Sequence, residues 1–408
     1  MGQPLDTLRL IAAGALTLAP AALLWGAVPG TDPAPTASPE LVDLGRRLFF
    51  DPNLSYHRTQ SCATCHDPGA GFADPRGSGV RRAVSLGDDG RSLGDRNAPT
   101  ASYAALTPRF HRTANGTYIG GQFLDGREPD LAGQAGGPPL NPLEMGMPDK
   151  AAVVARLRED PVYVRGFMAL FGPGVWDDTA AAYRDMTQAI AAFEETNFFA
   201  PFDSKYDRHL RGEYRMTEQE ELGMTLFFST QFTNCHLCHQ LHKIPASTGE
   251  TFSNYEHHNI GVPANTAVRA LNGQPPGHVD PGLSANPAVR ANRDAQGQRG
   301  RFKTPTLRNV AVTGPYMHNG VFHDLRTVVL FYNQYNSKAP ARRMNPKTGA
   351  PWAPPEVPEN LSLTELETGP ALDDRRIDAL VAFLRTLTDR RYEHLPGVMG
   401  VVGPSKAD

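Results

Sequence analysis

Residues 44–50 read LGRRLFF, and residues 62–66, shortly after them, read CATCH. The same pair of motifs returns later in the chain, as LGMTLFF at 222–228 and CHLCH at 235–239. In each copy the leucines and phenylalanines have the spacing of an amphipathic helix. A helical segment and a five-residue motif that recur together, roughly 175 residues apart, indicate a duplicated helical unit.

Outside this repeat the chain also has a helical pattern. Apolar residues at helical spacing, with charged residues opposite them, occur at 151–158, 179–193 and 377–387. Strand-like alternation is scarce. The chain holds 39 glycines and 36 prolines, and the stretches richest in them lie at 136–148, 272–287 and 339–358. These patterns predict helices separated by many ordered loops.

The four cysteines all lie in the two CxxCH motifs, so none remains for a structural disulfide. A CxxC pair can also be a redox dithiol or half of a zinc site, but the adjacent histidine in both copies favours covalent c-type haem. Two thiols at this spacing reach the two vinyl groups of haem, and the next imidazole reaches the iron. We therefore expect one haem on Cys62 and Cys65 and another on Cys235 and Cys238. The proximal iron ligands are then His66 and His239.

The sixth position of each iron decides the reactivity. No histidine lies between His66 and His111, and residues 76–95 hold neither histidine nor methionine. An open coordination site on the first haem is therefore expected. For the second haem the spacing does not choose among the later candidates, which are Met317, His318, His323, Tyr332, Tyr335 and Met344.

The N-terminal residues 1–39 are expected to be an export signal or an uncleaved membrane anchor, followed by a Pro/Ala linker. Residues 10–28 form an uncharged apolar run, and the sequence leaves its cleavage open. Since c-type haem is attached outside the cytoplasm, we expect an exported, periplasmic protein, with anchoring to the inner membrane as an option. The net charge of −3 argues against nucleic acid as a partner.

The chain resembles the bacterial di-haem cytochrome c peroxidases, and within them the branch typified by MauG, over nearly its whole length after residue 40. The segments that carry the resemblance are SCATCHDPGAGFAD (61–74), DRNAPT (95–100), FLDGREPDLAGQAGGPPLNPLEMGM (123–147), NCHLCH (234–239) and FKTPTLRNVAVTGPYMHNG (302–320). The resemblance implies an all-α fold of two cytochrome c-like domains, each with one covalent c-type haem. We expect them at 40–200 and 205–392, followed by a tail at 393–408.

The resemblance also implies a peroxide-reactive first haem whose distal pocket is lined by Gln134, Pro138 and Glu144. A glutamate in such a pocket takes the first proton of a bound peroxide and returns it to the leaving oxygen, while an amide orients the peroxide. Taken alone, Glu144 also reads as a solvated loop acid and Gln134 as a helix-surface residue.

Two further ligand sets follow from the resemblance. A calcium ion is implied between the domains, held by the Asn97 side chain and the backbone carbonyls of Thr313 and Pro315; the alternative is that Asn97 caps a helix that begins near Pro99. Tyr332 lies fourteen residues after His318, where the MauG branch has its axial tyrosine. The alternative is that Tyr332 is a core tyrosine. A tyrosinate ligand would lower the reduction potential of the second haem.

Two positions depart from the MauG pattern. Leu124 stands where the family has a tryptophan between the haems, and Thr233 stands where MauG has a surface tryptophan before its second haem motif. In addition, Arg127 and Arg308 are candidates to pair with haem propionates, with salt bridges between helices as the alternative.

The sequence therefore predicts a di-haem oxidoreductase that reacts with hydrogen peroxide at the first haem and oxidises a periplasmic partner protein through the second. One alternative is a peroxidase that reduces hydrogen peroxide to water with electrons from a small cytochrome or copper protein. The alternative of another class is a non-enzymatic di-haem electron carrier.

Overall fold

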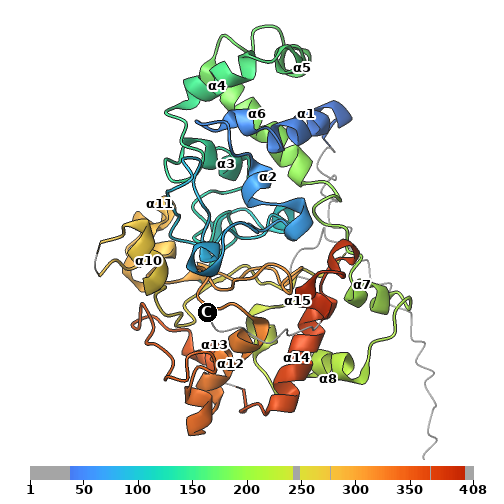
Figure 1. Cartoon of the computed structure of the whole chain (residues 1–408), viewed down its shortest axis with the longest axis vertical. Coiled ribbons are helices and arrows are strands. Elements are labelled where there is room, and N and C mark those ends of the chain that lie inside the picture. The colour runs from blue at the N-terminus through green and yellow to red at the C-terminus, as the bar shows by residue number, and fades with distance from the viewer. Residues whose placement is uncertain (1–36, 242–248, 276, 368, 400–408) are drawn as a thin grey trace, which may run out of the picture. The chain divides into compact units, whose positions relative to one another are not determined.

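The computed structural model describes residues 37–241, 249–275, 277–367 and 369–399 (Figure 1). The predicted export or anchor segment at 10–28 and the end of the predicted tail lie outside the described residues. The helices of the first half are α1 (Pro39–Phe49), α2 (Cys62–Cys65), α3 (Leu131–Ala135), α4 (Lys150–Arg158), α5 (Pro161–Phe171) and α6 (Thr179–Glu194). Those of the second half are α7 (Lys205–Leu210), α8 (Glu218–Phe228), α9 (Cys235–Cys238), α10 (Thr266–Asn272), α11 (Pro287–Arg290), α12 (Leu325–Asn336), α13 (Leu363–Leu366), α14 (Asp374–Thr386) and α15 (Pro396–Met399).

The two LGxxLFF segments form the central helices that the repeat predicts. Helix α1 begins at Ser38, whose hydroxyl accepts a hydrogen bond from the Leu41 amide, and α8 begins at the capping box of Thr217 and Glu220. Helix α1 packs on α6, and α8 packs on α14. The second pair therefore repeats the first, which supports the duplication inferred from the motifs.

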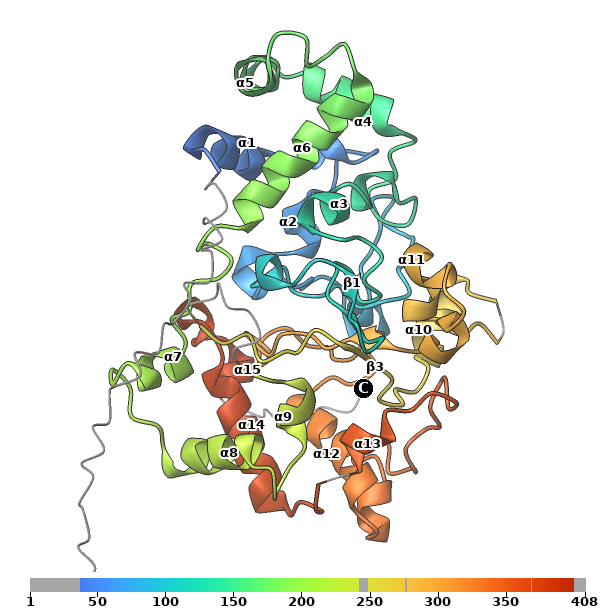
Figure 2. The ribbon, with the colours of Figure 1, turned by 180° about the vertical axis from the view of Figure 1, so that it is seen from behind.

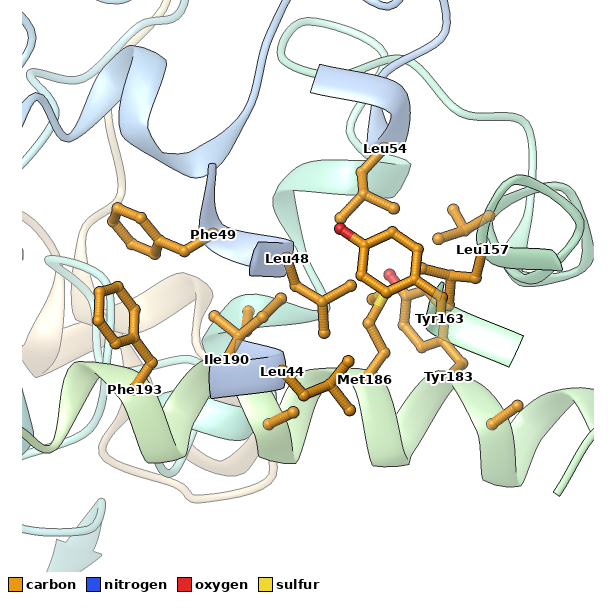
Figure 3. Packing of buried hydrophobic residues seen from close by; sticks show 14 of the residues in the cluster. Leu44, Leu48, Phe49, Leu54, Leu157, Tyr163, Tyr183, Met186, Ile190 and Phe193 are labelled. Atoms are coloured by element: carbon orange, nitrogen blue, oxygen red, sulfur yellow. The ribbon is translucent and has the colours of Figure 1, made fainter. Parts of the chain in front are cut away.

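Each helix pair anchors its own hydrophobic cluster. In the first, Leu44 and Leu48 of α1 lie against Met186 and Ile190 of α6 (Figure 3). In the second, Phe227 of α8 lies with Phe383 of α14, with a ring-centroid distance of 5.2 Å. Burial of this apolar surface is the main stabilising contribution to each half.

Strands are few in the described part of the chain. They comprise four two-residue segments, β1 (His111–Arg112), β2 (Tyr118–Ile119), β3 (His257–His258) and β4 (Phe302–Lys303). β1 pairs antiparallel with β2, β3 pairs antiparallel with β4, and a bridge between Ile119 and Glu256 connects the two pairs. In Figure 2, β1 and β3 lie between the α1–α6 pair and the α8–α14 pair.

The predicted helical segments 151–158, 179–193 and 377–387 correspond to α4, α6 and α14, so the helix-rich fold class is confirmed. The described residues from Ser38 onward belong to one compact unit. The division into two domains at 40–200 and 205–392 stays a prediction. None of the helices in the described ranges has the length and apolar character needed to span a bilayer.

Candidate active site

A cavity of about 390 Å³ lies beside the first CxxCH motif. Its wall contains Cys62, Cys65 and His66, and these are joined by the three residues expected on the distal side, Gln134, Pro138 and Glu144. The structure therefore brings all six predicted residues to one cavity. Among the histidines of the described ranges, His66 alone lines it.

The imidazole of His66 is oriented by the backbone. Its Nδ1–H donates to the carbonyl of Phe72, with 3.3 Å between the atoms, which leaves Nε2 as the metal-binding atom. His239 repeats this arrangement with the carbonyl of Phe252 at 2.9 Å. Burial lowers the pKa of both histidines, that of His239 to about 4. Each imidazole is therefore neutral, as an iron ligand must be.

The distal residues come from α3 and the loop-rich segment that follows it. Gln134 lies in α3, Pro138 begins the following turn, and the backbone N–H of Glu144 donates to the carbonyl of Asn141. Burial raises the pKa of Glu144 above its ordinary value. Its side chain is half-buried, and a raised pKa favours the proton transfers expected of a group on the distal side.

Sequence analysis missed Glu194, which also lines the first cavity. This glutamate ends α6 and is only 5 % exposed, and burial raises the pKa of its carboxyl to about 8. The signal was present in the helix, because Glu194 shares its face with Ile190 and Thr187. A carboxyl on an apolar helix face indicates either a partner or a protonated group.

A second cavity, of about 350 Å³, lies beside the second CxxCH motif. Its wall contains Cys235, Cys238 and His239 together with Tyr332 of α12. Burial raises the pKa of Tyr332, and the electrostatic effect of the nearby Cys238 and Cys235 acts in the same direction.

The structure also places the sixth-ligand candidates of the second haem in different surroundings. Met317 and His318 line the second cavity with Tyr332, but His318 is stacked on Phe302, with a centroid distance of 3.7 Å. Tyr335 donates its hydroxyl to the carbonyl of Ile260. The remaining two candidates, His323 and Met344, are exposed.

The two cavities share part of their walls. Residues 97–100 and 122–124 line both of them, so Leu124 lies between the two motifs. Beside it, Phe123 is covered by the guanidinium of Arg127, which lies 3.6 Å from the ring centroid. Position 124 therefore has the location that the family resemblance gives to its tryptophan, but it offers an aliphatic side chain.

Comparison with known proteins decides the family. A family model described as di-haem cytochrome c peroxidase matches residues 39–215. The methylamine utilization protein MauG of Paracoccus denitrificans is 57 % identical over 378 residues, which cover 93 % of this chain and 96 % of that relative. The chain belongs to the di-haem cytochrome c peroxidase family, in its MauG-like branch.

Solved structures agree with this membership. The crystal structure of the di-haem peroxidase BthA from Burkholderia thailandensis has a TM-score of 0.76 at 35 % identity, with 87 % of each chain covered. A MauG-like protein associated with microbial copper homeostasis has a TM-score of 0.62 at 28 % identity, covering 90 % of this chain and 98 % of that one. Members of this family carry two haems. The protein is a MauG-like di-haem oxidoreductase of the peroxidase type.

The residues around both motifs fit the haems that the family implies. All four cysteines are free thiols, each pair lines a cavity, and each following imidazole is held by a backbone carbonyl. Three residues expected to hold calcium, Asn97, Thr313 and Pro315, line the second cavity together. The Asn97 side-chain N–H donates to the carbonyl of Ala83, which leaves its amide oxygen for a cation. No helix begins near Pro99, so the capping alternative for Asn97 is wrong.

The structure also shows the surroundings of Thr233, Arg308 and Arg127. Thr233 is buried, and its hydroxyl donates to the carbonyl of Leu226. Arg308 is fully buried and paired with Asp207 through two hydrogen bonds of 2.6 and 2.8 Å, so it is a structural salt bridge and not a propionate partner. Arg127 pairs with Asp125 and lines the first cavity.

Lys303 is a further residue that sequence analysis missed. It lies in β4, lines the second cavity and donates from Nζ to the carbonyl of Gly121. Burial lowers the pKa of its ammonium to about 7. A cation in this position would be stabilised by an anionic group in the cavity, such as a haem propionate.

Proposed function

We propose that this protein is a periplasmic enzyme with two covalent c-type haems, one on Cys62 and Cys65 and the other on Cys235 and Cys238. The haem-binding units are two cytochrome c-like domains at 40–200 and 205–392. Hydrogen peroxide reacts at the first haem, and a partner protein is oxidised through the second. The Paracoccus denitrificans relative is named a methylamine utilization protein, and we propose the same setting for this enzyme.

The first haem, with His66 behind its iron, supplies the redox chemistry when it is bound. The protein residues on the other side manage the peroxide. Glu144 accepts the proton of the incoming peroxide and later returns it to the oxygen that leaves. Gln134 orients the peroxide through its amide, and Pro138 excludes water from the same wall. Burial raises the pKa of Glu144, which favours its holding the proton between the two transfers.

His239 and Tyr332 are the proposed axial ligands of the second haem. Tyr332 is enclosed in the wall of the second cavity with Cys235 and Cys238. An anionic phenolate stabilises oxidised states of an iron more than a thioether does, so this site is suited to storing an oxidising equivalent. A calcium ion held by Asn97, Thr313 and Pro315 between the two halves is part of the same proposal.

The observation that carries the proposal is the composition of the first cavity. Gln134, Pro138 and Glu144 converge on the cavity that holds His66, and no other histidine of the described ranges reaches it. An iron held there by His66 would have no second histidine of the described ranges beside it, and the half-buried carboxyl of Glu144 would be available for proton transfer.

Stopped-flow absorption of the diferric protein with one equivalent of hydrogen peroxide tests this proposal. We expect a fast change in the Soret band that persists without added reductant. Glu144→Gln should slow that change by roughly two or more orders of magnitude, the usual contribution of a proton-transfer group. Glu159→Gln, on an exposed side chain paired with Arg58, should leave it unaltered. A protein that reacts only after one haem has been reduced would disprove an open first haem.

The position of Leu124 favours a second candidate function, the reduction of hydrogen peroxide to water with electrons from a small cytochrome or copper protein. Without an aromatic ring at Leu124, sharing of charge between the two haems is weaker. Rapid decay of the peroxide-induced spectrum in the presence of such a reduced donor, without oxidation of a partner side chain, would support this candidate. A non-enzymatic carrier would show no reaction with peroxide in either redox state.

A further inference from the structure

Oxidation of a partner protein needs a route from the second haem site to the molecular surface. In this chain the position before the second motif cannot supply it, because Thr233 is 5 % exposed and has no aromatic ring. Such a route then requires another redox-active side chain that connects the wall of the second cavity with solvent. This inference rests on the proposed function, in which Tyr332 is a ligand of the second haem.

Three aromatic rings connect the second cavity with the surface. Tyr332 lines the cavity, and its ring centroid lies 6.0 Å from that of Phe331 in an edge-to-face contact. Phe331 in turn lies 5.5 Å from Trp352, again edge to face. Trp352 also contacts Phe322, at 5.7 Å. The rings therefore form a continuous path from Tyr332 to an indole that lies outside the cavity wall.

Trp352 has the properties of the terminal member of such a path. It is half-buried, while Phe331 and Phe322 behind it are buried. Its Nε1–H donates to the carbonyl of Arg342 at 3.1 Å, and its backbone N–H donates to the carbonyl of Arg343. These two hydrogen bonds hold Trp352 in place at the surface. The first keeps the Nε1 proton of the indole in a hydrogen bond. Indole is also the aromatic side chain that gives up one electron most readily, together with phenol.

We propose that Trp352 is the residue through which oxidising equivalents leave the second haem site toward the partner protein. A partner side chain loses one electron to the oxidised indole of Trp352. The oxidised indole forms when Trp352 gives one electron across Phe331 to Tyr332, which would hold the second haem, and Phe331 itself is not oxidised. The Nε1 proton stays on the indole. Two such transfers consume the two oxidising equivalents of one hydrogen peroxide molecule, which becomes water.

In the absence of a partner, Trp352 itself becomes the electron source. Loss of two electrons and two protons, with uptake of an oxygen atom from water, converts its side chain to a hydroxylated indole. This product is detected by peptide mass spectrometry, a measurement independent of turnover. Trp176 is the matched control, because it is also half-buried and packs on an aromatic ring, Phe167, at 4.9 Å. Phe167 has its other ring contact with Phe171, and neither phenylalanine lines a cavity, so no path of rings leads from Trp176 to a cavity wall.

The experiment treats the holoenzyme with several equivalents of hydrogen peroxide without a reductant, digests it, and compares oxygen incorporation at Trp352 and Trp176. We expect several-fold more oxygen at Trp352, and we expect Phe331→Leu to lower the value at Trp352 alone. Equal incorporation at the two tryptophans in the wild-type protein would overturn the inference, as would an unchanged value in Phe331→Leu. The Soret band of the same samples is recorded. A spectrum that does not respond to peroxide would instead mean that the proposed function fails, and the inference with it.

Discussion

Gly45 of α1 is in direct backbone contact with Ala189 of α6, since a β-carbon on Gly45 would lie 1.8 Å from the carbonyl oxygen of Ala189. The second half repeats this contact between Gly223 of α8 and Ala379 of α14, where the corresponding distance is 1.9 Å. The glycine of each LGxxLFF segment thus allows two helices to approach more closely than any side chain permits. This explains why glycine occurs at the same place in both copies.

Substitution of either glycine should therefore destabilise the protein. We expect Gly45→Ala and Gly223→Ala to lower the free energy of unfolding by at least about 2 kcal/mol, because a carbonyl group cannot move aside without separating the helices. Gly166→Ala in α5 is the control, since its β-carbon would meet only Leu44, at 3.9 Å. That change should raise stability by about 0.5–1 kcal/mol. Denaturant unfolding of the three holoproteins measures the differences, and equal stability of all three would contradict the packing argument.

Glu194 should make stability depend on pH. Its carboxyl has a pKa of about 8 in the folded protein, raised by burial from an ordinary value of 4.5. The folded state therefore binds this proton more tightly, and the stabilisation that results is complete below about pH 4.5 and is lost as the pH rises through about 8. Glu194→Gln should flatten this decline, whereas Glu159→Gln on the surface should not. Unfolding free energies measured from about pH 5 to about pH 9 test the prediction, which an equal slope in Glu194→Gln and wild type would refute.

The salt bridge between Arg308 and Asp207 should be important for stability and not for haem binding. Arg308 is fully buried, and its Nε also donates to the carbonyl of Glu250. Arg308→Met leaves the buried Asp207 carboxylate uncompensated and should cost about 3–5 kcal/mol. Arg211→Met, at an exposed pair with Glu213, should cost less than about 1 kcal/mol. Thermal unfolding compares the two variants. If Arg308→Met changed only the haem spectra, the propionate role rejected above would have to be restored.

Tyr332 and Tyr335 lie on the same helix and should respond differently to loss of their hydroxyl groups. Tyr332→Phe removes the proposed axial ligand, so we expect an altered absorption spectrum and a higher reduction potential for the second haem. Tyr335→Phe removes a hydroxyl that donates to the Ile260 carbonyl and should change neither. Spectroelectrochemical titration of both variants checks this. Matching potentials in Tyr332→Phe and wild type would show that another group holds the sixth position.

Sequence patterns predicted the helices well where local periodicity and packing agree. Helices α4, α6 and α14 follow apolar stripes that can be read from the chain, and their observed bounds differ by a few residues from the expected ones. Periodicity did not predict the role of Arg308, because its partner Asp207 is distant in sequence and only the fold brings the two together. The same holds for Lys303, whose position in a cavity wall has no local signal.

The sequence by itself determined the two haem-attachment motifs, the duplication and the helical character of the chain, since covalent attachment and helix periodicity depend on residues close together in the sequence. It also named Gln134, Pro138 and Glu144, through a family resemblance carried by one continuous segment. Only the tertiary structure decided that Leu124 lies between two cavities, that Glu194 is enclosed, and that Tyr332, Phe331 and Trp352 lie in contact. These relationships depend on burial and on the distances between segments far apart in the chain, which the packing of the whole protein sets.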